Sequence, residues 1–342
     1  MLYWENEFGK LYLGKAEDIL PTLEPNSVDM VVTSPPYWMA RKYLSDDELG
    51  QEPDYRVYID NLCKILDCTK YVLKDTGNLF VNIGDKYFSK NVGTGGKTEK
   101  QLTNAGSFFE QKKKIVPLMQ QGSLMNLPNR FAIQLVDEYY FILKHTLIWH
   151  KSNAFPTSNK KKFTLDFEYL FHFVLDIDNY YFEQQFEPST QATQDQYRNL
   201  LREDVDNLKA PYKNNAPRAS RKYKHDLVSI TGQPSPNRMW EDTESLKRQL
   251  ERGRNKRSVW TIPIGTERGT TNHIATYPRE LIKTPILACS PEKFGVVLDP
   301  FMGSGTTALM AQELNRRWLG IEVSEDYCKQ AAERINVEET TF

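Results

Sequence analysis

The sequence has few cysteines, no long apolar run and no cationic leader followed by an apolar segment. None of its four cysteines lies in a Cys-x-x-Cys pair, so neither a zinc site nor a disulfide framework is indicated. No apolar stretch approaches the ~20 residues that cross a membrane, and residues 1–7 do not resemble a signal peptide. The five histidines lack metal-ligand spacing. These absences favour a reduced, cytoplasmic protein without a bound metal, whose histidines are structural or lie on the surface.

The sequence also lacks an excess of charge of either sign. Lys and Arg together number 44 and Asp and Glu 45 among 342 residues. Bulk charge therefore gives no indication of a nucleic-acid partner, and any basic surface must be local. The length is sufficient for one large domain with a substantial core and a smaller one.

Segments with strand and helix patterns alternate along most of the chain, which predicts a mostly parallel α/β sheet. Two of the predicted strands, at residues 141–149 and 167–175, are expected to form a hairpin. The remaining strands are expected at residues 10–14, 28–32, 78–84, 294–298 and 318–323, and helices at residues 16–23, 55–73, 129–140, 309–315 and 324–335.

The buried strand predicted at residues 28–32 runs directly into Ser34-Pro35-Pro36-Tyr37. Proline cannot donate a hydrogen bond to a sheet, so this strand must end near Ser34. Ligands of open α/β sheets bind beyond the carboxyl ends of the strands. A serine hydroxyl, a proline carbonyl and an aromatic ring are therefore expected together, and they suit a planar ring that carries an amine. The alternative is that the prolines simply end a strand and that Tyr37 packs on the surface.

A second candidate site is the turn Gly303-x-Gly305-x-x-Ala308, between a predicted strand and a predicted helix. Glycine lets the backbone approach a nucleotide, and Ala308 permits close packing of the helix. Glu322 ends the next predicted strand, where an acid can bind both ribose hydroxyls. No Gly-Lys-Ser/Thr follows, which excludes a Walker phosphate loop. The pattern indicates an adenosine-type ligand, although the glycines alone would also fit a plain tight turn. Because so little chain follows Ala308, this turn must share its sheet with strands from earlier in the chain.

Residues 176–256 interrupt the alternation with a composition rich in Gln, Asn, Arg and Lys. Residues 209–257 contain 13 Lys and Arg against 5 Asp and Glu, a net charge of +8, and Tyr212, Tyr223 and Trp240 lie among these cations. A solvated loop is the alternative interpretation. The position between two parts of one sheet favours an insert that contacts nucleic acid.

Both candidate sites resemble motifs of the amino-methylating DNA methyltransferases. Ser34-Pro35-Pro36-Tyr37 resembles their catalytic motif, and Asp299-Pro300-Phe301-x-Gly303-x-Gly305-Thr306-Thr307 resembles their S-adenosylmethionine loop. The order of catalytic motif, insert and cofactor loop is similar to that of their permuted β class. The resemblance covers nearly the whole chain, including residues 273–281, which are similar to the segment near the methionine end of the cofactor.

The resemblance implies a Rossmann-like S-adenosylmethionine-dependent methyltransferase sheet with a circularly permuted motif order and an inserted target-recognition region. It places a catalytic part at residues 1–175, target recognition at 176–258 and a cofactor-binding part at 259–342. Relatives often carry an Asp after the glycine that matches Gly14, but this chain has Lys15. Glu17 or Asp18 could substitute, or the contact could be absent. The implied catalytic residues are Ser34, Pro35, Pro36 and Tyr37, and the implied cofactor-binding residues are Asp299, Pro300, Phe301, Gly303, Gly305, Thr306, Glu322, Thr276 and Pro278.

The implied activity is methyl transfer from S-adenosylmethionine to the exocyclic N4 of cytosine in double-stranded DNA, within a restriction-modification system. Ser rather than Asp before Pro-Pro-Tyr is more similar to the cytosine-N4 members than to the adenine-N6 members, which are the alternative. The target base would have to leave the duplex. No Pro-Cys dipeptide is present, which argues against carbon-5 methylation. A restriction endonuclease that acts on the same site would not need to bind this chain.

Other function classes explain less of the sequence. An NAD-dependent oxidoreductase would account for the glycine turn but not for Ser34-Pro35-Pro36-Tyr37 or the basic insert. A non-catalytic DNA-binding module would account for the insert only. An RNA methyltransferase is a closer alternative, because the motifs do not distinguish the two nucleic acids.

Overall fold

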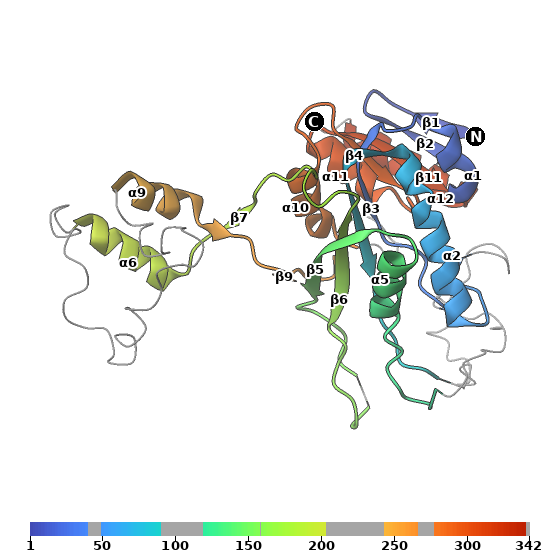
Figure 1. Cartoon of the computed structure of the whole chain (residues 1–342), viewed down its shortest axis with the longest axis horizontal. Coiled ribbons are helices and arrows are strands. Elements are labelled where there is room, and N and C mark those ends of the chain that lie inside the picture. The colour runs from blue at the N-terminus through green and yellow to red at the C-terminus, as the bar shows by residue number, and fades with distance from the viewer. Residues whose placement is uncertain (40–48, 90–118, 158, 203–242, 266–276, 340–342) are drawn as a thin grey trace. The chain divides into compact units, whose positions relative to one another are not determined.

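The computed structural model describes residues 1–39, 49–89, 119–157, 159–202, 243–265 and 277–339. The chain divides into two compact units (Figure 1). The first is Met1–Glu183 with Ser258–Phe342, and the second is Gln184–Arg257. Among the helices of the described ranges, none has the length and apolar character needed to cross a membrane.

In the described part of the first unit, nine strands form one sheet in the order β1-β2-β11-β10-β3-β4-β6-β5-β9. Neighbouring strands are parallel except in the pairs β1–β2, β4–β6 and β6–β5. This confirms the predicted mostly parallel α/β sheet and its antiparallel hairpin. The strands are β1 Leu2–Glu5, β2 Gly9–Leu13, β3 Val28–Thr33, β4 Leu73–Ile83, β5 Ile142–His150, β6 Phe167–Val174, β9 Val259–Thr261, β10 Val296–Asp299 and β11 Arg317–Glu322.

The two ends of the chain share the centre of this sheet. β10 and β11, from the last fifty residues, lie between β2 and β3. Leu298 of β10 pairs with Val31 of β3, and Glu322 of β11 pairs with Leu13 of β2, both in parallel register. Because parallel strands end at the same edge, the loop after β3 and the turn after β10 emerge side by side. The late glycine turn thus shares its sheet with the first strands, as the sequence predicted.

β3 is buried on both faces, which explains its continuous apolar run. All six of its residues are buried. Met30 and Val32 belong to the apolar cluster on one face of the sheet, and Val28 and Val31 to the cluster on the other. A strand covered on both sides needs no polar alternation.

Asp29 is the one charged residue of this strand and is 5% exposed. Its Oδ1 accepts a hydrogen bond from Lys74 Nζ of β4 at 2.7 Å, and its Oδ2 accepts one from the backbone N–H of Val296 in β10 at 2.8 Å. A buried carboxylate is tolerated when it is paired in this way. Asp29 therefore links β3 to both neighbours and helps to fix their register.

Helices cover both faces of the sheet (Figure 1). One apolar cluster contains residues of α1, α2 and α5, and the other contains residues of α10, α11 and α12. The helices of the first unit are α1 Ala16–Ile19, the short 3-10 helix η1 Leu20–Thr22, α2 Tyr55–Asp67, α3 Thr69–Val72, α5 Leu127–Asp137, α10 Arg279–Cys289, α11 Thr306–Glu313 and α12 Glu325–Glu339.

The helix predicted at residues 55–73 is divided into α2 and α3, and β4 begins already at Leu73. Leu73 pairs with Val28, and the register shifts between Val28 and Met30. The carbonyl of Thr76 accepts the N–H of Tyr181 at 2.9 Å. These long-range pairings draw residues 73–77 into the sheet, although their sequence is typical of a helix end and a turn.

The second unit contains β7 Phe186–Glu187, α6 Gln191–Arg202, α9 Thr243–Arg252 and β8 Arg254–Asn255. β7 and β8 pair antiparallel, and α6 packs against α9. The carboxylate of Glu187 accepts hydrogen bonds from Arg254 at 2.8 Å and from Arg257 at 2.7 Å. Tyr212, Tyr223 and Trp240 of the predicted basic insert lie outside the described residues.

Candidate active site

The loop that follows β3 is held in place through its main chain. The carbonyl of Pro36 accepts a hydrogen bond from the hydroxyl of Tyr58 in α2 at 2.9 Å. Lys86 Nζ donates to the carbonyls of Trp38 at 2.9 Å and Met39 at 3.1 Å. α2 and the segment after β4 therefore anchor the loop that contains the predicted catalytic residues.

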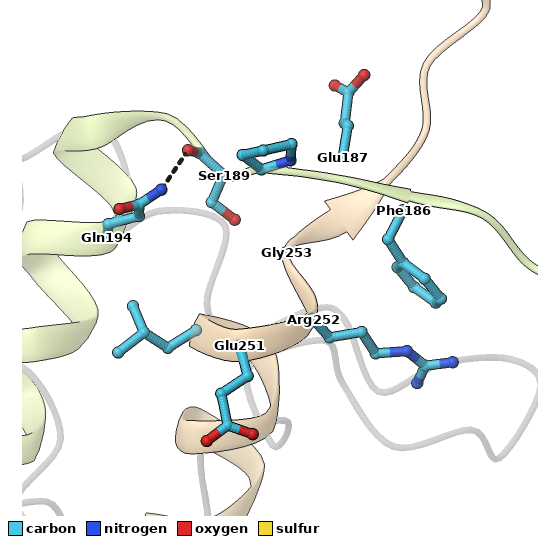
Figure 2. Close-up of a pocket in the computed structure, with 9 residues that line it drawn as sticks. Phe186, Glu187, Ser189, Gln194, Glu251, Arg252 and Gly253 are labelled. Carbon is cyan, nitrogen blue, oxygen red and sulfur yellow. Dashed lines mark hydrogen bonds between the residues drawn. The ribbon is translucent and has the colours of Figure 1, made fainter. Parts of the chain in front are cut away.

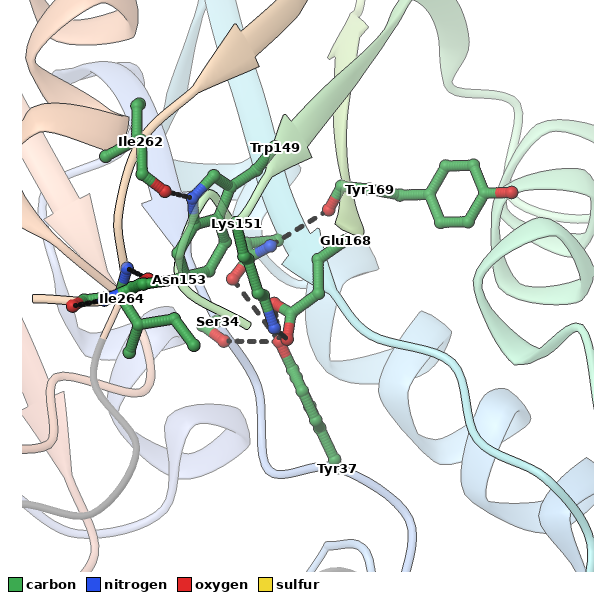
Figure 3. A network of polar contacts seen from close by, with 10 residues as sticks. Ser34, Tyr37, Trp149, Lys151, Asn153, Glu168, Tyr169, Ile262 and Ile264 are labelled. Atoms are coloured by element: carbon green, nitrogen blue, oxygen red, sulfur yellow. Dashed lines mark hydrogen bonds and ion pairs between the residues drawn. The ribbon is translucent and has the colours of Figure 1, made fainter. Parts of the chain in front are cut away.

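Tyr37 is the centre of a polar network beside this loop (Figure 3). Its hydroxyl donates to Glu168 Oε2 of β6 at 2.8 Å and lies 3.3 Å from Asn82 Oδ1 of β4. Lys151 forms an ion pair with the other oxygen of Glu168. Burial and the Glu168 carboxylate raise the pKa of Tyr37 well above its usual value. Tyr37 is thus a neutral phenol whose ring is held by contacts at its far end.

Ser34 Oγ joins the same network from the sheet edge. It lies 3.5 Å from the hydroxyl of Tyr37, to which it donates. A serine hydroxyl has one proton and two acceptor lone pairs, so this contact leaves the lone pairs of Ser34 available. Among the described residues no hydrogen bond to the carbonyl of Pro35 is found. Two acceptors from adjacent residues are therefore present at the end of β3.

Gly84 explains how this network packs so closely. A Cβ at this position would lie 3.0 Å from the ring of Tyr37 and 3.1 Å from Glu168 Oε1. Contacts this short are rarely tolerated, so a larger residue would displace the phenol or the carboxylate. The glycine after β4 therefore keeps Tyr37 and Glu168 in contact.

The turn after β10 has the left-handed backbone that glycine adopts without strain. Gly303 has φ +53° and Gly305 has φ +84°. A Cβ on Gly305 would lie 3.2 Å from Ala331 of α12, whereas the nearest atom to a Cβ on Gly303 would be 4.0 Å away. Gly305 thus permits close packing against α12, whereas a Cβ at Gly303 would make only an ordinary contact, with the carbonyl of Phe301.

Glu322 lies directly beside this turn and is 9% exposed. Its Oε2 accepts the N–H of Gly303 at 2.8 Å, and its Oε1 accepts the N–H of Ser324 at 2.9 Å. Burial raises the pKa of this carboxyl. Each oxygen retains one further lone pair, so the group can still accept two hydroxyl hydrogens. An open glycine turn with such a carboxylate fits the adenosine part of S-adenosylmethionine.

The carboxylate of Asp299 is buried within the protein and is not exposed to a ligand. It is 1% exposed, and its Oδ1 accepts hydrogen bonds from Thr33 Oγ1 at 2.6 Å and from the N–H of Phe301 at 3.0 Å. Its Oδ2 accepts the hydroxyls of Tyr277, at 3.2 Å, and Thr307. All four partners belong to the protein. Asp299 therefore connects the residue before Ser34 to the glycine turn.

The other predicted cofactor residues gather around the same turn. Pro300 and Thr306 are buried, and Phe301 is half-buried. Pro278 precedes α10 and follows Tyr277, whose hydroxyl contacts Asp299 and thereby brings this segment to the turn. Thr276 lies outside the described residues.

Lys15 stands at the same sheet edge. The preceding residue, Gly14, donates its N–H to the carbonyl of Glu322 at 2.9 Å. Lys15, Glu17 and Asp18 are all exposed. The position at which relatives often have an acid therefore carries an exposed cation beside the end of β11.

Glu168, Asn82 and Lys151 belong to the polar network around Tyr37 but were not among the residues predicted for the site. Asn82 lies within the predicted strand at residues 78–84, and Lys151 lies two residues after the predicted strand at residues 141–149. Glu168 is a lone acid between aromatic residues in the predicted strand at 167–175. A carboxylate in a buried strand needs a polar partner. This requirement is the sequence signal that could have identified Glu168.

No group of His, Cys, Asp or Glu suited to a metal ion is found among the described residues. His172 is 1% exposed and bonds to Asn78 Oδ1 at 2.8 Å and to His145 Nδ1 at 3.0 Å. Burial, with a smaller effect of His145, lowers the pKa of His172 to about 3. It is therefore a neutral residue within the sheet.

A pocket of about 170 Å³ lies in the second unit, between β7 and the facing ends of α6 and α9 (Figure 2). Glu187 and Glu251 are among its lining residues. Its walls contain none of the predicted site residues, and Arg252 lines it together with the two acids.

The sequence matches the protein family described as DNA methylase, the N6/N4 methyltransferases, over residues 28–333. It is 30% identical over 328 residues to the Type II methyltransferase M.SmaI of Serratia marcescens, covering 95% of this chain and 90% of that protein. It is 29% identical over 332 residues to the Type II methyltransferase M.Cfr9I of Citrobacter freundii, covering 96% and 88%.

Solved structures share the fold. The PvuII DNA methyltransferase, which is cytosine-N4-specific, matches with a TM-score of 0.56 at 18% identity and covers 96% of this chain and 86% of that one. A putative DNA modification methylase of Thermus thermophilus in complex with S-adenosyl-L-methionine matches with a TM-score of 0.52 at 21% identity, covering 97% and 95%. From the family match and the near full-length relatives, the chain belongs to the N6/N4 family of S-adenosylmethionine-dependent DNA methyltransferases.

Proposed function

We propose that this chain methylates the exocyclic N4 of cytosine at a specific site in double-stranded DNA. The observation that carries the proposal is the position of Ser34, a neutral residue directly after β3, the strand that pairs with the strand before the glycine turn. Serine rather than aspartate before Pro-Pro-Tyr favours cytosine over adenine. The cytosine-N4 specificity of the PvuII enzyme, which shares the fold, is consistent with this choice.

The residues of the loop suit the chemistry of an exocyclic amine, which is a weak nucleophile because its lone pair is delocalised into the ring. Ser34 Oγ and the Pro35 carbonyl accept its two hydrogens and draw the nitrogen toward tetrahedral geometry. Tyr37 stacks on the base, and its contact with Glu168 holds the ring in orientation. S-adenosylmethionine supplies the electrophilic methyl group. Positioning the amine in line contributes much of the rate, and the base must first leave the duplex.

We further propose that the Gln184–Arg257 unit belongs to a target-recognition region at residues 176–258. Residues 1–175 and 259–342 would then form the methyltransferase domain. The local net charge of +8 at residues 209–257 supports contact with DNA phosphates. The Type II relatives support a role in restriction-modification, in which an endonuclease would read the same DNA site independently.

Glu322 is expected to contribute to cofactor affinity. Glu322→Gln keeps the side-chain shape but turns one acceptor into a donor that faces a backbone N–H. We expect the dissociation constant for S-adenosylmethionine, measured by isothermal titration calorimetry, to rise by at least about tenfold, or ~1.4 kcal/mol. Glu325→Gln, an exposed acid at the start of α12, is the matched control. Equal affinities for the two variants would remove Glu322 from the cofactor site.

The proposed function is tested by the modified base itself. The chain is expressed in a bacterial host without DNA methyltransferases, and the DNA is digested to nucleosides for mass analysis. We expect N4-methylcytosine, which sequencing should place at one recurring site. If N6-methyladenine were the only modified base, the target base would be adenine and not cytosine. Faster methylation of RNA than of DNA in vitro would show that DNA is not the preferred substrate.

A further inference from the structure

The loop that joins β5 to β6 carries two aromatic side chains in water. Phe155 is 88% exposed and Phe163 is 94% exposed. Single exposed apolar residues are common on protein surfaces, but two large and almost fully exposed rings in one short loop are unusual and call for a partner. Neither residue has a role in the site described above.

This hairpin loop spans residues 152–165, and its described residues, 152–157 and 159–165, are anchored at the base. The N–H of Lys151 donates to the carbonyl of Asp166 at 2.7 Å across the two arms. The side chain of Asn153 accepts the N–H of Ile264 at 2.6 Å and donates to its carbonyl at 3.1 Å. Phe155 follows only two residues after Asn153. The exposed ring of Phe155 therefore extends from a hairpin whose first residues are fixed by hydrogen bonds.

The hairpin loop rises from the rim of the candidate active site. β5 ends at the same edge as β4 and β3, because the antiparallel β6 lies between β5 and β4. Lys151, the last residue before the loop, pairs with Glu168, and Glu168 contacts Tyr37 (Figure 3). In Figure 1 the loop extends beyond the lower ends of β5 and β6. We therefore expect DNA that presents a base to Ser34 to pass close to the loop.

The charge of the hairpin loop matches a polyanion. Residues 152–165 contain Lys160, Lys161 and Lys162 and no acid. Lys160 and Lys161 are exposed, whereas Lys162 Nζ lies 3.8 Å from the ring centre of Tyr87. Lysines release counterions when they neutralise phosphates, and aromatic rings stack on unpaired bases or wedge between base steps. Cations and exposed rings on one loop are the combination that nucleic-acid-binding surfaces use.

We propose that the hairpin loop is a DNA wedge for this methyltransferase. Lys160 and Lys161 bind the phosphate backbone, and Phe155 and Phe163 stack on the bases left exposed when the target base is extruded. The wedge lowers the cost of extrusion, so it acts before methyl transfer and independently of whether the acceptor is cytosine or adenine. It therefore goes beyond the proposed N4 specificity.

The test uses the full chain with both aromatic residues replaced, Phe155→Ser with Phe163→Ser. Tyr140→Asn is the matched control, because Tyr140 is 80% exposed but precedes β5 at the opposite edge of the sheet. We measure kcat/KM on a duplex that contains the methylated site mapped in host DNA, and on the same duplex with the target base mispaired. The melting temperature of each variant shows that the fold is retained.

On the paired duplex the double variant is expected to lose roughly 10- to 100-fold in kcat/KM, the range for one stacked base. On the mispaired duplex, whose target base is already partly unstacked, the loss should shrink to about twofold at most. The control should match the wild type on both. Equal losses on the two duplexes, or no loss on either, would overturn the wedge. Loss of self-association instead of DNA activity would assign the aromatic residues to a second copy of the chain.

Substitution of the two exposed lysines tests the proposed phosphate contacts independently of the aromatic residues. Lys160→Gln with Lys161→Gln should reduce the slope of log affinity against log salt by roughly one unit for each lysine. An unchanged slope would contradict the phosphate contacts. Because the wild type is assayed on the same duplexes, failure of the proposed N4 activity is distinguished from failure of the wedge.

Discussion

Replacing Ser34 with alanine is expected to lower kcat for DNA methylation by on the order of 10²–10³-fold, the range seen when one preorganised transition-state contact is removed. Alanine has no lone pairs to accept an amine hydrogen, so the nitrogen keeps its conjugation with the ring. The glycine turn and Glu322 are unchanged, and S-adenosylmethionine should bind as in the wild type. Single-turnover methylation of DNA and calorimetric titration of the cofactor measure the two effects separately.

Ser27→Ala is the matched control for this variant. Ser27 lies just before the other end of β3, where its hydroxyl donates to the carbonyl of Glu24, far along the strand from the proposed site. We expect its activity to equal that of the wild type. If Ser34→Ala turned over as fast as Ser27→Ala, Ser34 would have no role in the chemistry. A parallel loss of cofactor affinity would instead indicate damage to the whole sheet edge.

The second large effect is expected for Asp299→Ala. This change leaves three hydroxyls and one backbone N–H without the carboxylate that accepts them in a buried site. Breaking such a network destabilises a protein by roughly 3–5 kcal/mol, which lowers the melting temperature on the order of 10 °C for a unit of this size. Calorimetry measures the shift. The cofactor affinity should also fall, because the glycine turn loses its link to β3.

Asp67→Ala serves as the comparison. Asp67 forms a surface ion pair with Lys70 at 2.7 Å, and exposed pairs of this kind contribute at most about 1 kcal/mol. A melting temperature for Asp299→Ala close to that of Asp67→Ala would show that the buried network adds no stability. Normal stability with lost cofactor binding would instead indicate that Asp299 contacts the ligand directly.

The centre of the fold could be predicted because its local and long-range signals agree. β3 is a short β-branched run that ends at two prolines, and burial on both faces selects that composition. The turn at Gly303 follows a short apolar run that is typical of a strand, and the structure pairs that strand, β10, with β3 from early in the chain. Both features are properties of composition and position, which a sequence displays directly.

The start of β4 and the helix α10 could not be predicted in the same way. Residues 73–77 have the pattern of a helix end and turn, but pairing with β3 makes them part of β4. α10 contains Pro285 in its interior, which normally disfavours a helix. Its residues Leu281, Ile282 and Ile286 are nevertheless buried against the sheet. In both cases tertiary packing outweighs the local preference.

The site was predictable at the level of motifs but not of contacts. Ser34 and Gly303 were recognisable from local pattern, whereas the contact of Glu168 with Tyr37 spans 131 residues of sequence. Asp299 was expected as a cofactor residue, and the structure places its carboxylate among four protein donors. Such pairings depend on which strands become neighbours, and that is decided only by the complete sheet.

The central claim is that the loop after β3 and the turn after β10 form one site for an amine and a methyl donor. A crystal structure with S-adenosylhomocysteine, the demethylated cofactor, tests this directly. The reacting nitrogen must fit between the methyl position and Ser34 Oγ with near-attack and hydrogen-bond spacing. We therefore predict the ligand sulfur within about 8 Å of Ser34 Oγ, with its ribose on Glu322. A ligand bound elsewhere, or with its sulfur turned away from Ser34, would contradict the account.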